Sequence, residues 1–186
     1  MHLVEVAPLL FRNVAGPELV AFRQDQAGRI THLFDEEPMI AYERQPWYRN
    51  TRLHLGILGG SAALFLVILG RAFVRRREPI PASAVLGRRL LLGAALAYLA
   101  FVAAAVWLGS DFIGLIFGDS NRKLQAALTL PVVGAVLTLG AAVSAAQQWR
   151  NGVGTVSSRL RFSALVGVAL LFAWSLNEWN LLGWKL

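Results

Sequence analysis

Four long stretches of this 186-residue chain contain no Asp, Glu, Lys or Arg, and the charged residues gather at their ends and between them. The stretches cover residues 53–70, 90–110, 124–149 and 162–177. A helix of about 20 apolar residues crosses the roughly 30 Å hydrocarbon layer of a bilayer. The pattern therefore predicts four transmembrane helices, of which the fourth is the shortest. Pro131 lies within the third, where we expect a kink rather than a helix end.

The first 50 residues follow a shorter period. Runs of β-favouring residues occur at 9–14, 19–25, 29–34 and 39–43, and turn-forming residues separate them. These runs predict four antiparallel strands in a meander. Alternation predicts three pairs of side chains on faces that could pack: Val20 with Phe22, Ile30 with Phe34, and Ile40 with Tyr42. It predicts that Arg23, Asp25 and Arg29 point outward.

The two patterns together predict a mainly α membrane protein, in which four transmembrane helices follow a small antiparallel β meander. We expect an extracytoplasmic β segment at 1–50 and a four-helix transmembrane region at 51–186. Four short strands are near the lower limit for a self-sufficient core. We therefore expect another structure to cover the sheet.

Composition agrees with a membrane protein, because 56% of the residues are hydrophobic and only 16% are charged. The absence of cysteine excludes a disulfide framework, a thiolate metal site and a cysteine nucleophile. The net charge is +7, and the excess of arginine lies in two segments between apolar stretches, 71–89 and 150–161. This distribution indicates topology rather than nucleic-acid binding, for which we see no basic face.

Charge also predicts orientation. Nine Lys and Arg residues fall in 71–89 and 150–161, against six near the opposite ends of the helices. Cytoplasmic segments carry the larger share, so we expect both termini outside the bacterial cytoplasmic membrane. Residues 1–5 lack the features of a signal peptide, so the first helix would carry the N-terminal segment across. Tryptophans close to the predicted helix ends fit the membrane interface: Trp47, Trp107, Trp149 and Trp179.

Few side chains suggest chemistry. The predicted helices contain no carboxylate, lysine or arginine, which counts against a pump, a charge-coupled transporter or an ion channel. We interpret His54 as interfacial, His32 as a sheet position and the acidic run 35–37 as a solvated turn, although each residue type also binds metals. Three pairs of small residues at helix-packing spacing predict close helix contacts: Gly56 with Gly60, Gly93 with Ala97, and Gly140 with Ser144.

The N-terminal segment has specific features. It contains LVEVAPLLFR at 3–12, AFR at 21–23 before Asp25, GRITHLF at 28–34 and YERQPWY at 42–48, followed by a predicted membrane helix. This arrangement resembles the C-terminal end of membrane-anchored bacterial serine hydrolases related to class C β-lactamases and penicillin-binding proteins. The resemblance implies a periplasmic catalytic domain, followed by this β extension and several transmembrane helices.

The chemistry of that family lies in elements that this sequence lacks in the proper order. They are Ser-x-x-Lys, Tyr-x-Asn, and a His-x-Gly or Lys-Thr-Gly strand. Isolated look-alikes occur at Tyr48-Arg49-Asn50, His54-Leu55-Gly56 and Ser120-Asn121-Arg122-Lys123. A nucleophile and its base must converge on a rigid scaffold beside an oxyanion hole. We therefore assign no catalytic, cofactor-binding or metal-binding residue and expect no cofactor.

Two functions remain open. In the first, the chain is the membrane-anchoring C-terminal module of a β-lactamase-related serine hydrolase, with the catalytic domain on a separate chain or upstream of Met1. In the second, it is a standalone, non-enzymatic four-helix membrane protein whose β module binds a partner. The lipid bilayer is the expected partner in both cases, with a hydrolase domain or another membrane protein beside it. Neither predicts that this chain is an enzyme by itself.

Overall fold

The computed structural model describes residues 2–34, 41–43, 46–74, 82–110 and 121–183. The chain forms two compact units, Met1–Asn50 and Thr51–Leu186. The acidic run 35–37, residues 39–40 of the predicted strand 39–43, and Ser120 lie outside the described residues.

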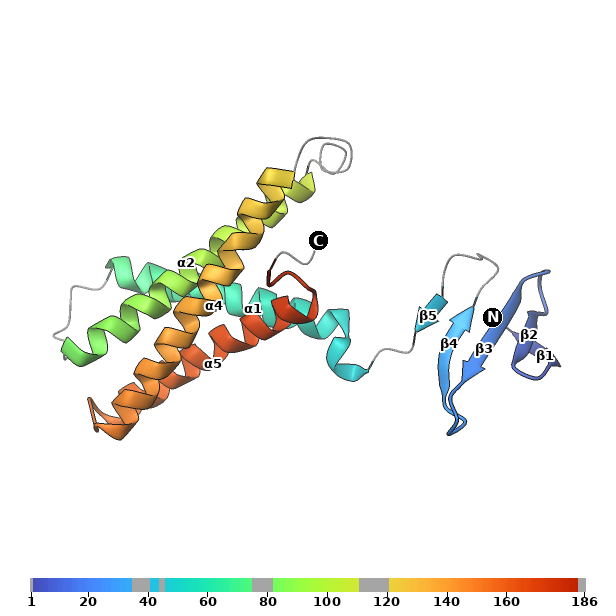
Figure 1. Cartoon of the computed structure of the whole chain (residues 1–186), viewed down its shortest axis with the longest axis horizontal. Helices are drawn as coiled ribbons and strands as arrows, with labels where there is room; N and C mark the ends of the chain where they lie inside the picture. The colour runs from blue at the N-terminus through green and yellow to red at the C-terminus, as the bar shows by residue number, and fades with distance from the viewer. Residues whose placement is uncertain (1, 35–40, 44–45, 75–81, 111–120, 184–186) are drawn as a thin grey trace. The chain divides into compact units, whose positions relative to one another are not determined.

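The N-terminal unit is one antiparallel sheet in which neighbours in sequence are neighbours in space (Figure 1). Its strands are β1 (Leu3–Ala7), β2 (Leu10–Asn13), β3 (Leu19–Gln24), β4 (Ile30–Phe34) and β5 (Ala41–Glu43). The predicted meander is confirmed, but the prediction of four strands is wrong because it omits β1. Every residue of β1 is exposed, so no buried face marked it in the sequence. It forms by pairing with β2 across a tight turn in which Leu9 adopts a left-handed backbone (φ 63°).

Strand register decides which side chains share a face of the sheet. Phe22 pairs with Leu33, and Leu33 pairs with Tyr42, while Phe11 pairs with Val20. Since alternate residues point to the same side of a strand, these five form one apolar face. The rings of Phe11 and Phe22 meet edge to face at 5.4 Å between centroids.

The expected packing of Ile30 with Phe34 is wrong. Phe34 lies on the opposite face of β4 from Leu33, and both Ile30 and Phe34 are exposed. An irregularity between Arg23 and Gln24 shifts the pairing so that Gln24 faces Ile30. The sequence pattern pointed to the wrong residues of β4 because a register shift cannot be read from alternation within one strand.

The C-terminal unit consists of α1 (Thr51–Val74), α2 (Ala82–Ser110), α4 (Asn121–Arg150) and α5 (Val156–Glu178). All four helices are long and apolar enough to cross a membrane, which confirms the four predicted spans. Each helix continues past its uncharged stretch into flanking charged residues. Pro131 lies inside α4 without ending it, and the hydroxyl of Thr155 caps α5 by accepting the Ser158 N–H at 3.2 Å.

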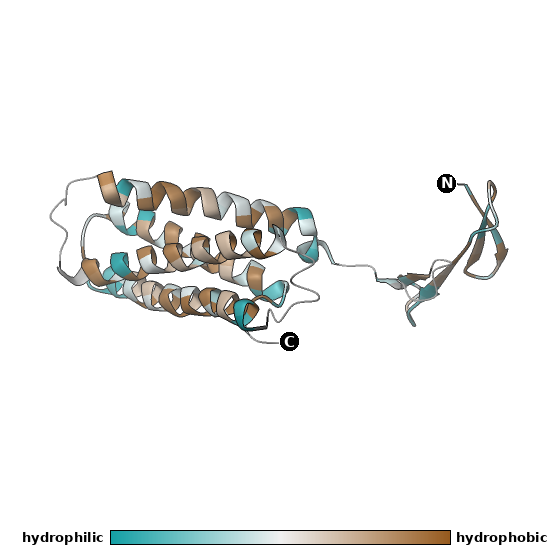
Figure 2. Cartoon of the chain, turned by 90° about the horizontal axis from the view of Figure 1, so that it is seen from above, coloured by the Kyte–Doolittle hydropathy of each residue, from teal (hydrophilic) through white to brown (hydrophobic). Residues whose placement is uncertain are grey.

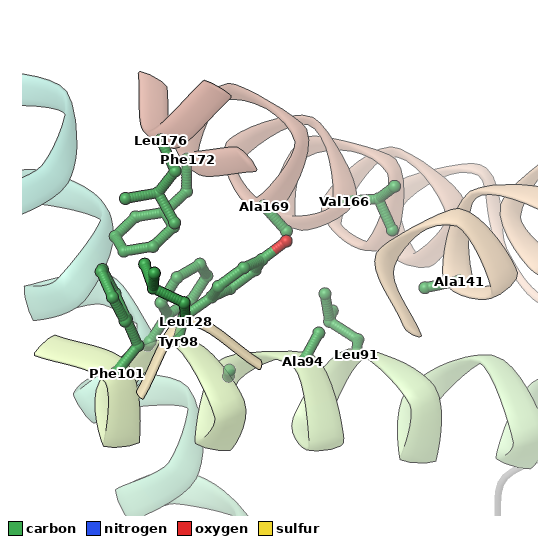
Figure 3. Packing of buried hydrophobic residues seen from close by; sticks show 12 residues of the cluster. Leu91, Ala94, Tyr98, Phe101, Leu128, Ala141, Val166, Ala169, Phe172 and Leu176 are labelled. Carbon is green, nitrogen blue, oxygen red and sulfur yellow. The ribbon is translucent and has the colours of Figure 1, made fainter. Parts of the chain in front are cut away.

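The helices pack in pairs, with the most extensive contact between α2 and α4. Three fully buried rings join the other helices to this pair, because Phe65 of α1 and Phe172 of α5 both contact Tyr98 of α2. The closest centroids, those of Tyr98 and Phe172, are 4.6 Å apart. Figure 3 shows Tyr98, Phe172 and their aliphatic neighbours filling the space between the helices.

Figure 2 shows that hydrophobic residues predominate along the helices and that hydrophilic residues gather toward their ends. Large side chains such as Leu66, Val136 and Leu171 are at least half exposed. A surface of this kind fits lipid, since a water-soluble protein rarely exposes so much continuous apolar area.

Small residues allow the closest helix approaches, but only part of the prediction holds. A Cβ built on Gly93 would lie 3.2 Å from Leu137, and one on Gly140 would lie 3.1 Å from Leu90, so both glycines lie at the α2–α4 contact. Gly56 and Gly60 have no atom within 4 Å of such a Cβ, so their predicted contact is wrong. The rotation of α1 about its axis points these glycines away from the neighbouring helices, and residue spacing alone does not determine that rotation.

Candidate functional site

A fully buried polar cluster lies where α1 begins and α5 ends. His54, in the first turn of α1, is completely buried. Its Nδ1 lies 2.6 Å from the Oγ of Ser175, which is also completely buried on α5. The hydrogen bond runs in the direction that the tautomer of the imidazole sets.

Two tryptophans of the C-terminal region surround the imidazole. The ring centroids of Trp174 and Trp179 lie 5.2 Å and 5.7 Å from that of His54. Such amphipathic rings suit a position between hydrocarbon and headgroups. Together with Ser175 they make a closed polar site that joins the first helix to the last.

The His54–Ser175 pair has the spacing of a base and a hydroxyl nucleophile. Its surroundings favour a structural role, because both side chains have no exposed surface and a substrate therefore does not reach the Ser175 hydroxyl. A hydrogen bond that satisfies two buried polar groups stabilises the contact between their helices.

A second buried polar link joins α2 to α4. The Thr138 hydroxyl donates to the Gly134 carbonyl oxygen at 2.8 Å, so it accepts from the Tyr98 hydroxyl, whose oxygen lies 3.1 Å away. A Cβ on Gly134 would lie 2.5 Å from Cε1 of Tyr98. The absence of a side chain at Gly134 therefore leaves space for the ring of Tyr98. The Tyr98 and Thr138 hydroxyl groups, although buried, both have hydrogen-bond partners.

The family look-alikes have local roles. Tyr48 contacts the ring of Trp47 edge to face, and the Asn50 N–H donates to the Trp47 carbonyl at the end of a short 3-10 helix, Trp47–Arg49. His54 belongs to the buried cluster with Ser175 described above. None of these residues forms, with the described parts of the chain, the convergent constellation that acyl transfer needs.

In the sheet, His32 is paired locally. Thr31 donates its hydroxyl proton to the Arg23 carbonyl oxygen, so the Thr31 oxygen accepts from Nδ1 of His32 at 3.0 Å. The imidazole also stacks on Phe34. Within the described ranges, no group of three His, Asp or Glu side chains has the geometry to hold a metal ion.

The β3–β4 turn is held by Asp25. Its carboxylate accepts from the N–H groups of Ala27 and Arg29 and from Nε of Arg29, all at 2.9 Å. The hydrogen bond from the Arg29 N–H is the main reason why the pKa of Asp25 lies below its ordinary value of 3.8, and the Arg29 guanidinium lowers it further. The expectation that Arg29 points outward is confirmed, whereas Asp25 is folded back into the turn.

Comparisons of the chain with protein-family models, characterised protein sequences and solved structures find no match. The resemblance to serine hydrolases therefore rests on the features of residues 3–48 and remains a prediction.

Sequence reasoning singled out His54 but missed its partners. Ser175 is 121 positions away and Thr138 is 40 positions from Tyr98. A signal was available, since hydroxyl and imidazole groups within apolar helices usually face other helices. Which hydroxyl meets which ring depends on helix rotation and pairing, which a single sequence does not reveal.

Proposed function

We propose that this chain is the membrane-anchoring module of a serine hydrolase related to class C β-lactamases and penicillin-binding proteins. Its helices would span the bacterial cytoplasmic membrane, and its sheet would support the catalytic domain on the extracytoplasmic side. The observation that carries the proposal is a sheet whose apolar face is not covered within its own unit, followed in the chain by four helices of membrane-spanning length.

The sheet supports a docking role because it has almost no core of its own. Val20 is the one buried side chain among the described residues of its unit. On the same face, Phe11, Phe22 and Leu33 are only half-buried, and Tyr42 is 54% exposed. Covering these side chains with a protein domain would remove apolar area from water, at about 25 cal/mol per Å².

The bundle supports anchoring rather than catalysis or transport. Its interior is filled by aromatic and aliphatic side chains, and two hydrogen bonds pair the buried side chains of His54 with Ser175 and of Tyr98 with Thr138. The hydroxyl that has a histidine partner, Ser175, is closed off from solvent. A structure of this kind holds helices together in lipid and leaves the chemistry to another domain.

The orientation belongs to the same proposal. With both termini outside, the β unit would lie on the side of the membrane where β-lactamase-related hydrolases act. Alkaline phosphatase fused after Asn151 would be inactive and a cytoplasmic fluorescent protein at the same position would be bright. Active phosphatase at Asn151 would contradict the orientation.

An antibody raised against the helical unit tests the proposal in native membranes. Membranes are labelled with a fluorescent penicillin or a fluorophosphonate, solubilised in mild detergent, and precipitated with the antibody. We expect the precipitated material to contain a labelled serine hydrolase, either joined to this chain or bound to it. A native band of 20.3 kDa with no labelled companion would contradict the proposal.

The uncovered sheet also fits the second candidate, a standalone membrane protein whose β module binds another protein. Amide hydrogen exchange on residues 1–46 expressed alone separates the two. We expect fast exchange or self-association if the sheet depends on a hydrolase domain. Slow exchange in a monomeric segment would favour an autonomous binding module.

A further inference from the structure

One arginine is held in an unusual position near the start of α5. The guanidinium carbon of Arg159 lies 4.9 Å from the ring centroid of Trp149, at the end of α4. The indole is itself fixed, because its Nε1–H donates to the Ser163 hydroxyl at 2.9 Å. An arginine on an aromatic ring keeps its fork of N–H donors in a set orientation.

The Arg159 side chain contains a hydrogen-bond donor without an acceptor among the described residues. Its Nε is buried and makes no hydrogen bond with any part of the chain that the structure describes. Leaving a charged donor without an acceptor is costly. Two parallel N–H groups of arginine match the oxygens of a phosphate, and because Nε is buried, the two terminal amino groups are the pair that would face such a ligand.

The surrounding charge favours an anion. Arg159 lies in the first turn of α5, and α5 starts at the end of the bundle where α2 also starts and where α1 and α4 finish (Figure 1). Described cations at this end are Arg71, Arg88, Arg89, Arg150, Arg159 and Arg161, and no described carboxylate accompanies them. At the opposite end, Glu178 accompanies the described cations Arg52, Arg122 and Lys123.

Three helices come close together at the basic end. A Cβ built on Gly87 would lie 2.7 Å from Cβ of Ser144 and 3.0 Å from Cζ of Phe162. Gly87 precedes Arg88 on α2, and Phe162 follows Arg161 on α5. The contact therefore brings the arginine-bearing turns of α2 and α5 to the same level of the bundle.

Apolar surface adjoins these arginines. Leu160 and Val156 on α5 are each 56% exposed, and Val143 on α4 is 58% exposed. A free phosphate ion would leave this surface uncovered. A phospholipid offers both parts, with a phosphate for the guanidinium and acyl chains for the apolar side chains.

We propose that Arg159, held on Trp149, is the centre of a binding site for the phosphate of an anionic phospholipid. Arg161 and the arginines at the start of α2 add positive charge around it. This site is distinct from general anchoring, because it depends on one oriented guanidinium and not only on the apolar surface of the helices.

Native mass spectrometry of the full chain in an uncharged detergent tests the site. Phosphatidylglycerol or phosphatidylcholine with the same acyl chains is added, and the lipid-bound fraction is measured. We expect preferential retention of phosphatidylglycerol and about a tenfold weaker affinity for it in Arg159→Gln, as loss of a charge-assisted pair implies.

Lys123→Gln is the matched control. Lys123 also lies over a tryptophan, at 5.7 Å from the Trp107 centroid, but at the opposite end of the bundle. This variant should retain phosphatidylglycerol within about twofold of the parent, because exposed charges at a distance contribute little. Equal losses in the two variants would show unspecific charge attraction and overturn the site.

Two further comparisons complete the test. Arg159→Lys keeps the charge but loses the fork, so it should bind more weakly than the parent, and equal binding would contradict an oriented guanidinium. Added inorganic phosphate should displace little phosphatidylglycerol. Complete displacement at millimolar phosphate would indicate a site for the free ion and overturn the assignment to lipid. Thermal unfolding of each variant confirms that it is folded.

Discussion

Phe65, Tyr98 and Phe172 in the helical unit have no exposed surface, whereas in the described part of the sheet unit only Val20 is buried. Both units have about the same kind of apolar side chains. The helices bury part of their apolar side chains against one another, and the remaining apolar side chains are available to lipid. The sheet has a single layer, so most side chains of its apolar face are only half-buried. The comparison shows that the helical unit has a buried core, whereas the described part of the sheet unit, taken by itself, has almost none.

Removing a ring from the core should have the largest effect. Phe172→Ala deletes a fully buried ring that contacts both Phe65 and Tyr98, so we expect a loss of about 3–5 kcal/mol. The neighbouring Leu171→Ala, at a position 50% exposed, should cost far less. Thermal unfolding in detergent micelles measures both, and similar losses would show that the bundle core is not the main source of stability.

A methyl group should have opposite effects at two glycines. Gly134→Ala forces Tyr98 to move, since the new Cβ would be 2.5 Å from its ring, and we expect a loss of about 1–3 kcal/mol. Gly60→Ala enters open space and should stabilise α1 by about 0.5–1 kcal/mol. If Gly60→Ala destabilised the protein, a close contact at Gly60 would have to exist after all. The same unfolding assay decides this.

The polar link between the first and last helices should contribute less than the rings. Ser175→Ala removes the hydroxyl bound to His54, and we expect a loss of about 1–2 kcal/mol. The exposed Ser157, changed to alanine, is the control. Combining Ser175→Ala with His54→Phe should recover part of the loss, because neither member of this hydrogen-bonded pair is then left without the other. An additive loss in the double variant would contradict direct coupling.

The smallest effect concerns the exposed turn of the sheet. The folded pKa of Asp25 lies below its ordinary 3.8, so the carboxylate stabilises the turn fully above that pH and loses its contribution as pH falls through the folded pKa. The protection factors of amides in the β3–β4 turn, which are corrected for the intrinsic exchange rate at each pH, should therefore fall at acidic pH. In Asp25→Asn this acid dependence should disappear, while exchange in the helices stays unchanged. A turn equally protected at all pH values would remove Asp25 from this role.

The sequence by itself determined the number of membrane helices, their approximate limits and the meander that precedes them. Uncharged stretches longer than 15 residues have few alternatives to a membrane span, and alternation with turn residues favours hairpins. These are local signals, repeated along each element, so they do not depend on distant partners.

Only the tertiary structure decided which side chains meet. The strand register placed Leu33, and not Ile30 or Phe34, beside Phe22. The rotation of each helix about its axis placed Gly134 against Tyr98 and left open space around Gly60. The packing of the helices also brought His54 to Ser175 and Arg159 to Trp149. Shifting a strand by one residue, or turning a helix through part of a turn, changes every such contact while hydropathy stays the same. The physical reason is that burial patterns define a face, but packing between faces selects the partners.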